Sequence, residues 1–237
     1  MAAGELLVEL RDVTKDYRGL RPLRISHLQL RAGDAVALLG FDQATAEVLV
    51  NLITGAILPD HGDVTVMGRR TASIQDPDTW VRTLDQFGLL SERAVLLDQL
   101  SAEQNLAMPL SLELDELPEP VRERVRALAD EIGLAAGDLR TALSALDATA
   151  RLRVRLGRAL ALNPRVLLAE HPNAALPAAD APAFAADLSR VAAGRGAALL
   201  VITADTTFAR AVAPEVLTLQ PATGELKRTP GWRRWFA

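Results

Sequence analysis

The stretch Ala35–Ile53, AVALLGFDQATAEVLVNLI, decides the fold of this chain. Its first five residues form a continuous apolar run, which is typical of a buried strand, and Gly40 follows them. The residues after Gly40 are predicted to form a loop that runs into a helix, which continues from Ala46 to Ile53. A strand, a loop and a helix in this order are the setting of a phosphate-binding loop. Its pattern is glycine, any four residues, glycine, lysine and then serine or threonine.

The chain keeps the frame of this loop and lacks its chemistry. Counting from Gly40, Thr45 stands at the second glycine, Ala46 at the lysine and Glu47 at the hydroxyl residue. In a working loop the lysine neutralises the phosphates and the hydroxyl binds Mg²⁺. Ala46 supplies no charge, and the carboxylate of Glu47 would repel a nucleotide. The sequence therefore predicts that nucleotide is not bound tightly.

Two carboxylates, Asp42 and Glu47, lie near the expected start of this helix. A negative charge at a helix N-terminus is stabilising by roughly 0.3–1 kcal/mol. One interpretation is that the carboxylates occupy the N–H groups that a phosphate would otherwise use. The other is that they cap an ordinary helix. Both interpretations argue against tight nucleotide binding.

The composition limits the classes of function open to the chain. With 237 residues, 49% of them hydrophobic, it is large enough for one α/β domain with a smaller subdomain. The formal net charge of -4 gives no reason to expect a nucleic-acid surface. The absence of cysteine removes disulfides, cysteine-ligated metals and thiol nucleophiles, and no metal site is expected. No signal peptide or bilayer-spanning apolar run is visible, so any membrane link is expected to come through a partner.

The hydrophobic pattern predicts strands that alternate with helices, which favours a mostly parallel sheet. Residues 101–145 carry helical periodicity broken by prolines, and Leu146–Leu162 is predicted to be one long helix. The alanine- and proline-rich piece Asn173–Phe184 is expected to be a loop that enters a helix. The strands expected from apolar residues are 6–10, 23–30, 35–39, 62–67, 166–169, 198–203 and 216–219.

Several further segments, in order along nearly the whole chain, give it a family resemblance. They are residues 6–17, 32–47, 58–68, 88–110 and 153–172. Together they resemble the ATP-binding subunit of ABC transporters, in the class that serves lipoprotein release, macrolide export and cell division. The resemblance implies a P-loop NTPase-like α/β fold, with a mostly parallel sheet core, an antiparallel β subdomain and a helical subdomain. It also implies a single nucleotide-binding domain over residues 1–228, with the helical subdomain at about 95–160.

The resemblance also shows that the family's other catalytic positions are replaced in this chain. Glu92 stands at the Q-loop glutamine, Asp147 at the signature serine, Glu170 at the Walker B aspartate, His171 at the catalytic glutamate, Pro177 at the D-loop aspartate and Ala204 at the switch histidine. Only Glu170 keeps the charge of the residue that it replaces. With Ala46 and Glu47, these replacements predict little or no ATP hydrolysis and no catalytic residue.

Two residues have alternative interpretations. His171 is either a general base, because neutral imidazole accepts a proton near pH 7, or a histidine that ends a strand. Phosphoryl transfer depends mostly on positioning and charge neutralisation, so a base alone would achieve little. Tyr17 matches the family's adenine-stacking aromatic residue, and it either stacks on adenine or packs at a strand end. Together with Gly40 it defines at most a weak or vestigial site for ATP with Mg²⁺.

Residues 229–237, TPGWRRWFA, form a short tail rich in aromatic and basic residues. The tail holds two of the three tryptophans of the chain, on either side of paired arginines. Such a pattern suits a membrane interface or a partner groove. The alternative is a tail that packs on its own domain or is disordered.

Three functions follow from the resemblance. In this family two such subunits form a head-to-tail dimer that drives a pair of membrane subunits. The first function is a pseudo-ATPase subunit that pairs with a competent ATPase subunit and contacts permease subunits at the cytoplasmic face of the membrane. The second is a regulatory scaffold of a membrane complex that works without nucleotide, and the third is an atypical ATPase with weak activity. We prefer the first, because every step of binding and hydrolysis is affected while the strand cores stay apolar.

Overall fold

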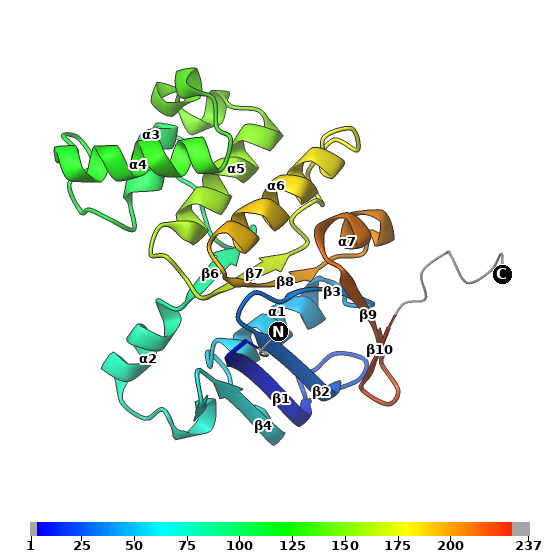
Figure 1. Cartoon of the computed structure of the whole chain (residues 1–237). Helices are drawn as coiled ribbons and strands as arrows, with labels where there is room; N and C mark the ends of the chain where they lie inside the picture. The colour runs from blue at the N-terminus through cyan, green and yellow to red at the C-terminus, as the bar shows by residue number, and fades with distance from the viewer. Residues whose placement is uncertain (1–3, 229–237) are drawn as a thin grey trace.

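A six-stranded sheet forms the centre of the molecule in the computed structural model, which describes residues 4–228 (Figure 1). Its strand order is β10-β9-β3-β8-β7-β6. The first five strands of this sheet in the chain run parallel to their neighbours, and β10 pairs antiparallel with β9 at one edge. The strands are β3 (Ala35–Leu39), β6 (Phe87–Leu90), β7 (Val166–Glu170), β8 (Ala198–Ile202), β9 (Glu215–Gln220) and β10 (Glu225–Arg228).

A second, antiparallel sheet lies below the central one in Figure 1 and has the order β2-β1-β4-β5. Along β2, buried apolar residues alternate with more exposed polar ones, as expected of a sheet with one wet face. Its strands are β1 (Leu6–Lys15), β2 (Leu23–Arg31), β4 (His61–Val66) and β5 (Arg69–Arg70). This sheet and the central sheet enclose α1 between them.

Most helices lie on the other face of the central sheet, and α3 to α5 extend beyond it (Figure 1). The α-helices are α1 (Gln43–Ile53), α2 (Pro77–Leu84), α3 (Ala102–Ala107), α4 (Glu119–Glu131), α5 (Ala148–Leu160), α6 (Ala181–Gly194) and α7 (Thr206–Val212). Short 3₁₀ turns are η1 (Thr71–Ser73), η2 (Ala136–Arg140) and η3 (Leu143–Ala145). The grouping of α3 to α5 lies within the predicted helical subdomain at about 95–160, whose bounds remain a prediction.

The two faces of the central sheet contact different hydrophobic cores. In β7, Leu167 and Ala169 join the core with helices α3 to α7, whereas Val166 and Leu168 join the core with α1 and the antiparallel sheet. Successive side chains of a strand point to opposite faces, so a strand covered on both sides has to be apolar at every position. This requirement explains the continuous apolar runs in the sequence.

The predicted α/β fold with a mostly parallel sheet is confirmed, and the seven expected strands are all present. The sequence did not predict four elements: strand β6, helix α2 and the edge strands β5 and β10. The helix expected to continue from Ala46 begins earlier, at Gln43, because Asp42 caps it. The long helix expected over Leu146–Leu162 is shorter, Ala148–Leu160.

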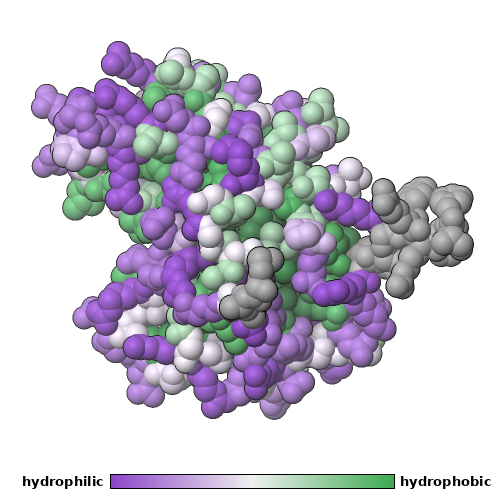
Figure 2. Space-filling model, viewed as in Figure 1, coloured by the Kyte–Doolittle hydropathy of each residue, from purple (hydrophilic) through white to green (hydrophobic). Residues whose placement is uncertain are grey.

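The described surface is mostly polar on the face shown in Figure 2, where hydrophilic residues cover the outer parts of both lobes. Among the described residues, no helix is both long enough and apolar enough to cross a membrane. The predicted aromatic and basic tail, 229–237, lies outside the described residues.

Candidate functional site

The connection between β3 and α1 is only three residues long, Gly40 to Asp42. Gly40 has φ +86°, and a Cβ at this position would lie 3.2 Å from the carbonyl oxygen of Leu219. A left-handed backbone next to a neighbouring strand favours glycine. Phe41 is buried in the core below the sheet. The chain therefore turns directly into the helix and forms no wide loop.

Asp42 takes the N–H groups at the start of α1. Its Oδ1 accepts hydrogen bonds from the backbone N–H of Thr45 at 2.8 Å and from the Thr45 hydroxyl at 2.7 Å. Its carbonyl oxygen accepts from the N–H of Ala46 at 2.9 Å. These hydrogen bonds from Thr45 hold the pKa of Asp42 below its usual value. The N–H of Thr45, one of the donors that a phosphate would need at a helix N-terminus, is thus bonded to the protein's own aspartate.

Ala46 and Glu47, the two positions that define the altered loop, have different surroundings. The side chain of Ala46 is fully buried in the core below the sheet. Glu47 turns toward the end of β7, and its Oε1 lies 3.5 Å from a guanidinium nitrogen of Arg93. One position faces the core, and the other forms an ion pair.

An arginine occupies the centre of the site. Glu170 ends β7 with a carboxylate that is 1% exposed. The hydroxyl of Ser91 donates to Glu170 Oε2 at 2.6 Å, and Arg93 Nε donates to the same oxygen at 3.1 Å. Arg93 Nη2 also pairs with Glu170 Oε1, and Nη1 lies 3.2 Å from Asn51 Oδ1. Hydrogen bonding to Glu170 raises the pKa of Arg93 above its usual value.

This geometry does not fit a magnesium nucleotide. In phosphate-binding loops Mg²⁺ is held by the hydroxyl residue of the loop and by a carboxylate at the end of a neighbouring strand. In this chain those positions are Glu47 and Glu170, and the guanidinium of Arg93 bridges them. In the described part of the chain, no three histidine, aspartate or glutamate side chains form a group that could hold a metal ion.

His171 and Tyr17 lie near the same end of the sheet. His171 has φ +43°, its N–H donates to the carbonyl of Ile202 at 2.7 Å, and its Nε2 is buried without a partner among the described residues. Tyr17 is half-buried over Gly19, where an added Cβ would meet its ring at 2.5 Å. Burial, together with the charge of Asp42, raises the pKa of the Tyr17 phenol. The general-base and adenine-stacking roles remain predictions.

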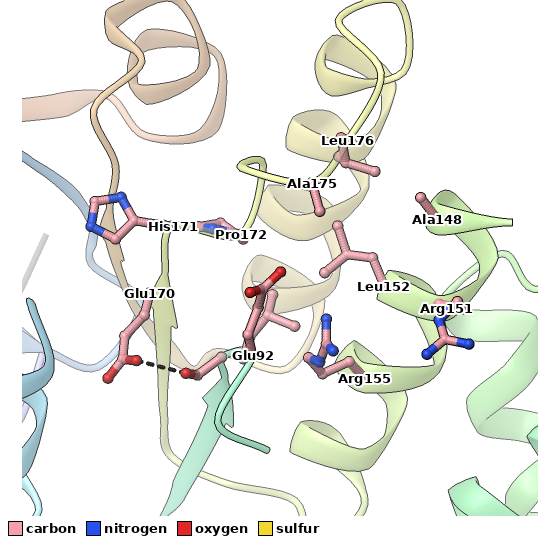
Figure 3. Close-up of a pocket in the computed structure, with 12 residues that line it drawn as sticks. Glu92, Ala148, Arg151, Leu152, Arg155, Glu170, His171, Pro172, Ala175 and Leu176 are labelled. Atoms are coloured by element: carbon pink, nitrogen blue, oxygen red, sulfur yellow. Dashed lines mark hydrogen bonds between the residues drawn. The ribbon is translucent and has the colours of Figure 1, made fainter. Parts of the chain in front are cut away.

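The other predicted positions are spread around this centre. Asp147 caps α5, accepting from the N–H of Ala150 at 2.7 Å. Pro177 and Ala204 are exposed in loops after β7 and β8. Glu92 lines a cavity of about 300 Å³ together with α5 and the segment after β7 (Figure 3).

The sequence analysis missed Ser91 and Arg93, which hold Glu170. A weak signal was available: β6 and β7 are neighbouring parallel strands, so the residues that follow each strand meet at one edge of the sheet. The Ser-Glu-Arg piece after β6 and the glutamate at the end of β7 therefore lie together. Which of the three side chains would turn to Glu170 depends on the local loop geometry.

Comparison with known proteins identifies similar sequences and folds. The family described as ABC transporter matches residues 23–174. A macrolide export ATP-binding/permease protein of Bordetella avium is 31% identical over 212 residues, which cover 87% of this chain and 32% of that protein. A lipoprotein-releasing system ATP-binding protein of Alcanivorax borkumensis is 29% identical over 80% of this chain and 82% of its own length.

The chain spans less than two thirds of several of these relatives. It covers 57% of a methionine import ATP-binding protein of Brucella abortus, to which it is 28% identical over 215 residues. Among solved structures, a dimeric bacterial ABC transporter cassette superposes with a TM-score of 0.77 and 23% identity, covering 95% of this chain and 100% of that chain. A protein from Clostridium perfringens that is part of an ABC transporter complex superposes with a TM-score of 0.80 and 17% identity. The match covers 94% of this chain and 87% of that chain.

Proposed function

The chain belongs to the ABC transporter family, and from that premise we propose that it is a pseudo-ATPase subunit of a membrane transport complex. In this proposal it keeps the ATP-binding-cassette fold over residues 1–228, with a helical subdomain at about 95–160. It pairs with a competent ATPase subunit, contacts permease subunits, and is held at the cytoplasmic face of the membrane by those partners.

One observation carries the proposal: protein groups fill both places that a magnesium nucleotide would need. Asp42 occupies the N–H of Thr45 at the start of α1, and Arg93 bridges Glu47 and Glu170. A nucleotide would have to displace both arrangements, and Ala46 offers no positive charge in return. None of Ala46, Glu47, Glu92, Asp147, Glu170, His171 and Ala204 is catalytic in this proposal, and Tyr17 with Gly40 is a vestigial nucleotide site.

The proposed partners are supported by the relatives. Their names describe ATP-binding proteins of export, import and lipoprotein-releasing systems, and one similar cassette was solved as a dimer. The exposed apolar side chains of Val95 and Leu97, 67% and 37% accessible, follow Glu92 at the Q-loop position. This segment resembles the transporter-facing part of the family and offers an apolar contact for a permease subunit.

Such a heterodimer has a consequence for turnover. Each composite site of a head-to-tail dimer borrows from both subunits, so one site would use the altered loop of this chain and the other its altered signature at Asp147. We therefore expect weak hydrolysis even with a competent partner. Brisk nucleotide-dependent turnover at the loop of the partner would contradict this expectation.

Nucleotide binding by the purified chain tests the catalytic half of the proposal. Titration with a fluorescent ATP analogue in the presence of Mg²⁺ is expected to give no saturable signal up to about 1 mM, the upper range of ordinary enzyme affinities. Hydrolysis of Mg-ATP by the wild type that is abolished by Glu170→Gln would instead establish an atypical ATPase.

Affinity purification of the tagged chain from detergent-solubilised membranes of its host, followed by mass spectrometry, tests the partners. We expect a permease and an ATP-binding subunit with an intact lysine loop. Recovery of a membrane protein without a second ATPase would favour the regulatory scaffold. Recovery of neither would contradict the transport complex and leave only the fold.

A further inference from the structure

The cavity beside Glu92 is lined by two opposite charges, Glu92 and Arg155, that lie near each other but form no hydrogen bond or ion pair within the described residues. It measures about 300 Å³, at the lower end of the roughly 300–1,000 Å³ typical of small-molecule sites. It lies between the segment after β6, one face of α5, and the segment after β7 (Figure 3). It is separate from the start of α1, where a nucleotide would be expected.

Arg155 is the unpaired positive charge. Its side chain projects from α5 into the cavity, and it makes no hydrogen bond or ion pair with any residue that the structure describes. Its Nε is buried without a partner. Burial lowers the pKa of Arg155, and the nearby charge of Glu92 opposes that change. Arg155 is half-buried and its Nε lacks an acceptor, so an anionic ligand group placed here would supply a charge-assisted hydrogen bond.

Glu92 is the unpaired negative charge. It is exposed at the mouth of the cavity and forms no hydrogen bond or ion pair within residues 4–228. The other charged groups of the lining are already engaged. Arg151 pairs with Asp98 at 2.6 Å and donates to the carbonyl of Leu143 at 2.9 Å, and Glu170 is held by Ser91 and Arg93.

The rest of the lining is apolar. Leu152, Ala175 and Leu176 lie above Glu92 and Arg155 in the view of Figure 3, and Ala148 and Pro172 also line the cavity. The imidazole of His171 points away from this group. A ligand that fills the cavity would therefore present one negative group, one positive group and an apolar body.

We propose that this cavity binds a small zwitterion of the α-amino acid class with an apolar side chain. Its carboxylate pairs with Arg155, its ammonium with Glu92, and its side chain packs against Leu152 and Leu176. A phosphate or a dicarboxylate fits less well, because Glu92 and the nearby Glu170 repel added negative charge. A simple amine leaves Arg155 without an acceptor. The cavity shares Glu92, Glu170 and His171 with the replaced catalytic positions, but binding of an amino acid does not require the proposed loss of ATP hydrolysis.

Isothermal titration of the full chain tests the proposal with four probes. They are L-leucine, 4-methylpentanoate, which lacks the ammonium, 3-methylbutylamine, which lacks the carboxylate, and inorganic phosphate. We expect saturable binding of leucine, and at least about tenfold weaker binding of each other probe, because each loses a charge-assisted contact. No binding of leucine up to about 10 mM would overturn the proposal and indicate that Glu92 and Arg155 pair with each other in solution.

Variants of the two charged residues test whether the ligand binds in this cavity. Arg155→Met and Glu92→Gln are each expected to weaken leucine binding at least about tenfold. Arg126→Met is the matched control, because Arg126 is a half-exposed arginine of α4 that pairs with Glu119. Unchanged binding by Arg155→Met, or phosphate binding as tight as leucine binding, would overturn the assignment. Glu92 is exposed, so its variant keeps the test valid even if Arg155→Met fails to fold.

Discussion

At the scale of single residues, the Arg93 side chain lies between Glu47 and Glu170, the two carboxylates at the proposed cation position. Glu47 and Glu170 would repel each other, and Glu170 is almost fully buried, so their charges need a positive partner between them. Arg93 supplies it, with a guanidinium that donates to several oxygens at once. The motif frame in the sequence predicted where the two carboxylates stand. It did not predict Arg93, because the choice of partner depends on the path of the chain after β6.

Replacement of Arg93 tests this arrangement. Arg93→Met leaves the buried carboxylate of Glu170 without its cation, and we expect the free energy of unfolding to fall by about 2–3 kcal/mol, below the usual range for a buried pair because Arg93 is a third exposed. Urea denaturation measures the change. The double variant Arg93→Met/Glu170→Gln should lose less free energy of unfolding than Arg93→Met alone, because it leaves no unpaired buried charge.

The same variant offers a second measurement. Without the guanidinium, the oxygens of Glu47, Glu170, Ser91 and Asn51 become available to a hard cation such as Mg²⁺ or Mn²⁺. We expect millimolar divalent cation, a concentration of about 1–5 mM, to raise the melting temperature of Arg93→Met and to leave the wild type unchanged. An equal effect on both proteins would show that Arg93 does not occupy a cation position.

Restoring the lysine alone should fail. Ala46 is fully buried in the core between the sheet and α1, so Ala46→Lys places a charge in an apolar environment. We expect a loss of about 3 kcal/mol of stability, a fall of about 6–12 °C in melting temperature, and no gain of ATP binding. Calorimetry with and without Mg-ATP measures both. A variant of wild-type stability that binds ATP would show that the start of α1 rearranges into a phosphate-binding loop.

At the scale of elements, sequence reasoning succeeded where burial is complete and failed where it is partial. Strands β3, β7 and β8 were predicted because both of their faces are covered, which requires continuous apolar residues. Helix α2 has no buried residue, and β5 is exposed, so neither carries a hydrophobic pattern to detect. The early start of α1 could not be read from periodicity, because it depends on a capping hydrogen bond that the Asp42 carboxylate accepts from the N–H of Thr45.

The cap of α1 provides a prediction about pH. The pKa of Asp42 is lowered in the folded state, chiefly by the hydrogen bond from the Thr45 hydroxyl. A lowered pKa means that the charged form contributes stability above the unfolded value of about 3.9, and that this contribution is lost as the pH falls through the folded value. Asp42→Ala should cost about 1 kcal/mol at neutral pH, and the difference from the wild type should shrink as the pH falls below the unfolded value of about 3.9.

Chemical denaturation at several pH values checks this dependence. Asp42→Asn keeps a capping side chain without the charge, so its stability at neutral pH should lie between those of the wild type and Asp42→Ala. The stability of Asp42→Asn should lack the pH dependence that the carboxylate of Asp42 gives to the wild type. A difference between the wild type and Asp42→Ala that stays constant down to about pH 3 would mean that the charge of Asp42 is not involved.

At the scale of the whole molecule, the nucleotide site that we propose to be vestigial bears on assembly. The family resemblance implies a head-to-tail dimer with two ATP molecules between the subunits, so we expect nucleotide to favour association. In this chain Asp42 and Arg93 occupy the groups that would bind ATP on one side. Asp147, which replaces the signature serine, would place a negative charge against the γ-phosphate on the other. Two copies of the chain would therefore bring together two composite sites that both lack their attractive contacts.

We predict that the purified chain does not dimerise with itself in response to nucleotide. Size-exclusion chromatography with light scattering should give the same mass with and without Mg-ATP, close to the 25.4 kDa of one chain. A competent ATP-binding subunit recovered with this chain from membranes should form a mixed dimer with it. In that dimer the intact loop of the partner faces the altered signature of this chain, and the intact signature of the partner faces the altered loop of this chain. The triple variant Thr45→Gly/Ala46→Lys/Glu47→Ser, which restores the glycine, lysine and serine of the loop, is compared with the wild type in the same measurement. A dimer of the wild type that forms only with Mg-ATP would contradict the pseudo-ATPase proposal, because it would require the nucleotide contacts that Asp42 and Arg93 are argued to replace.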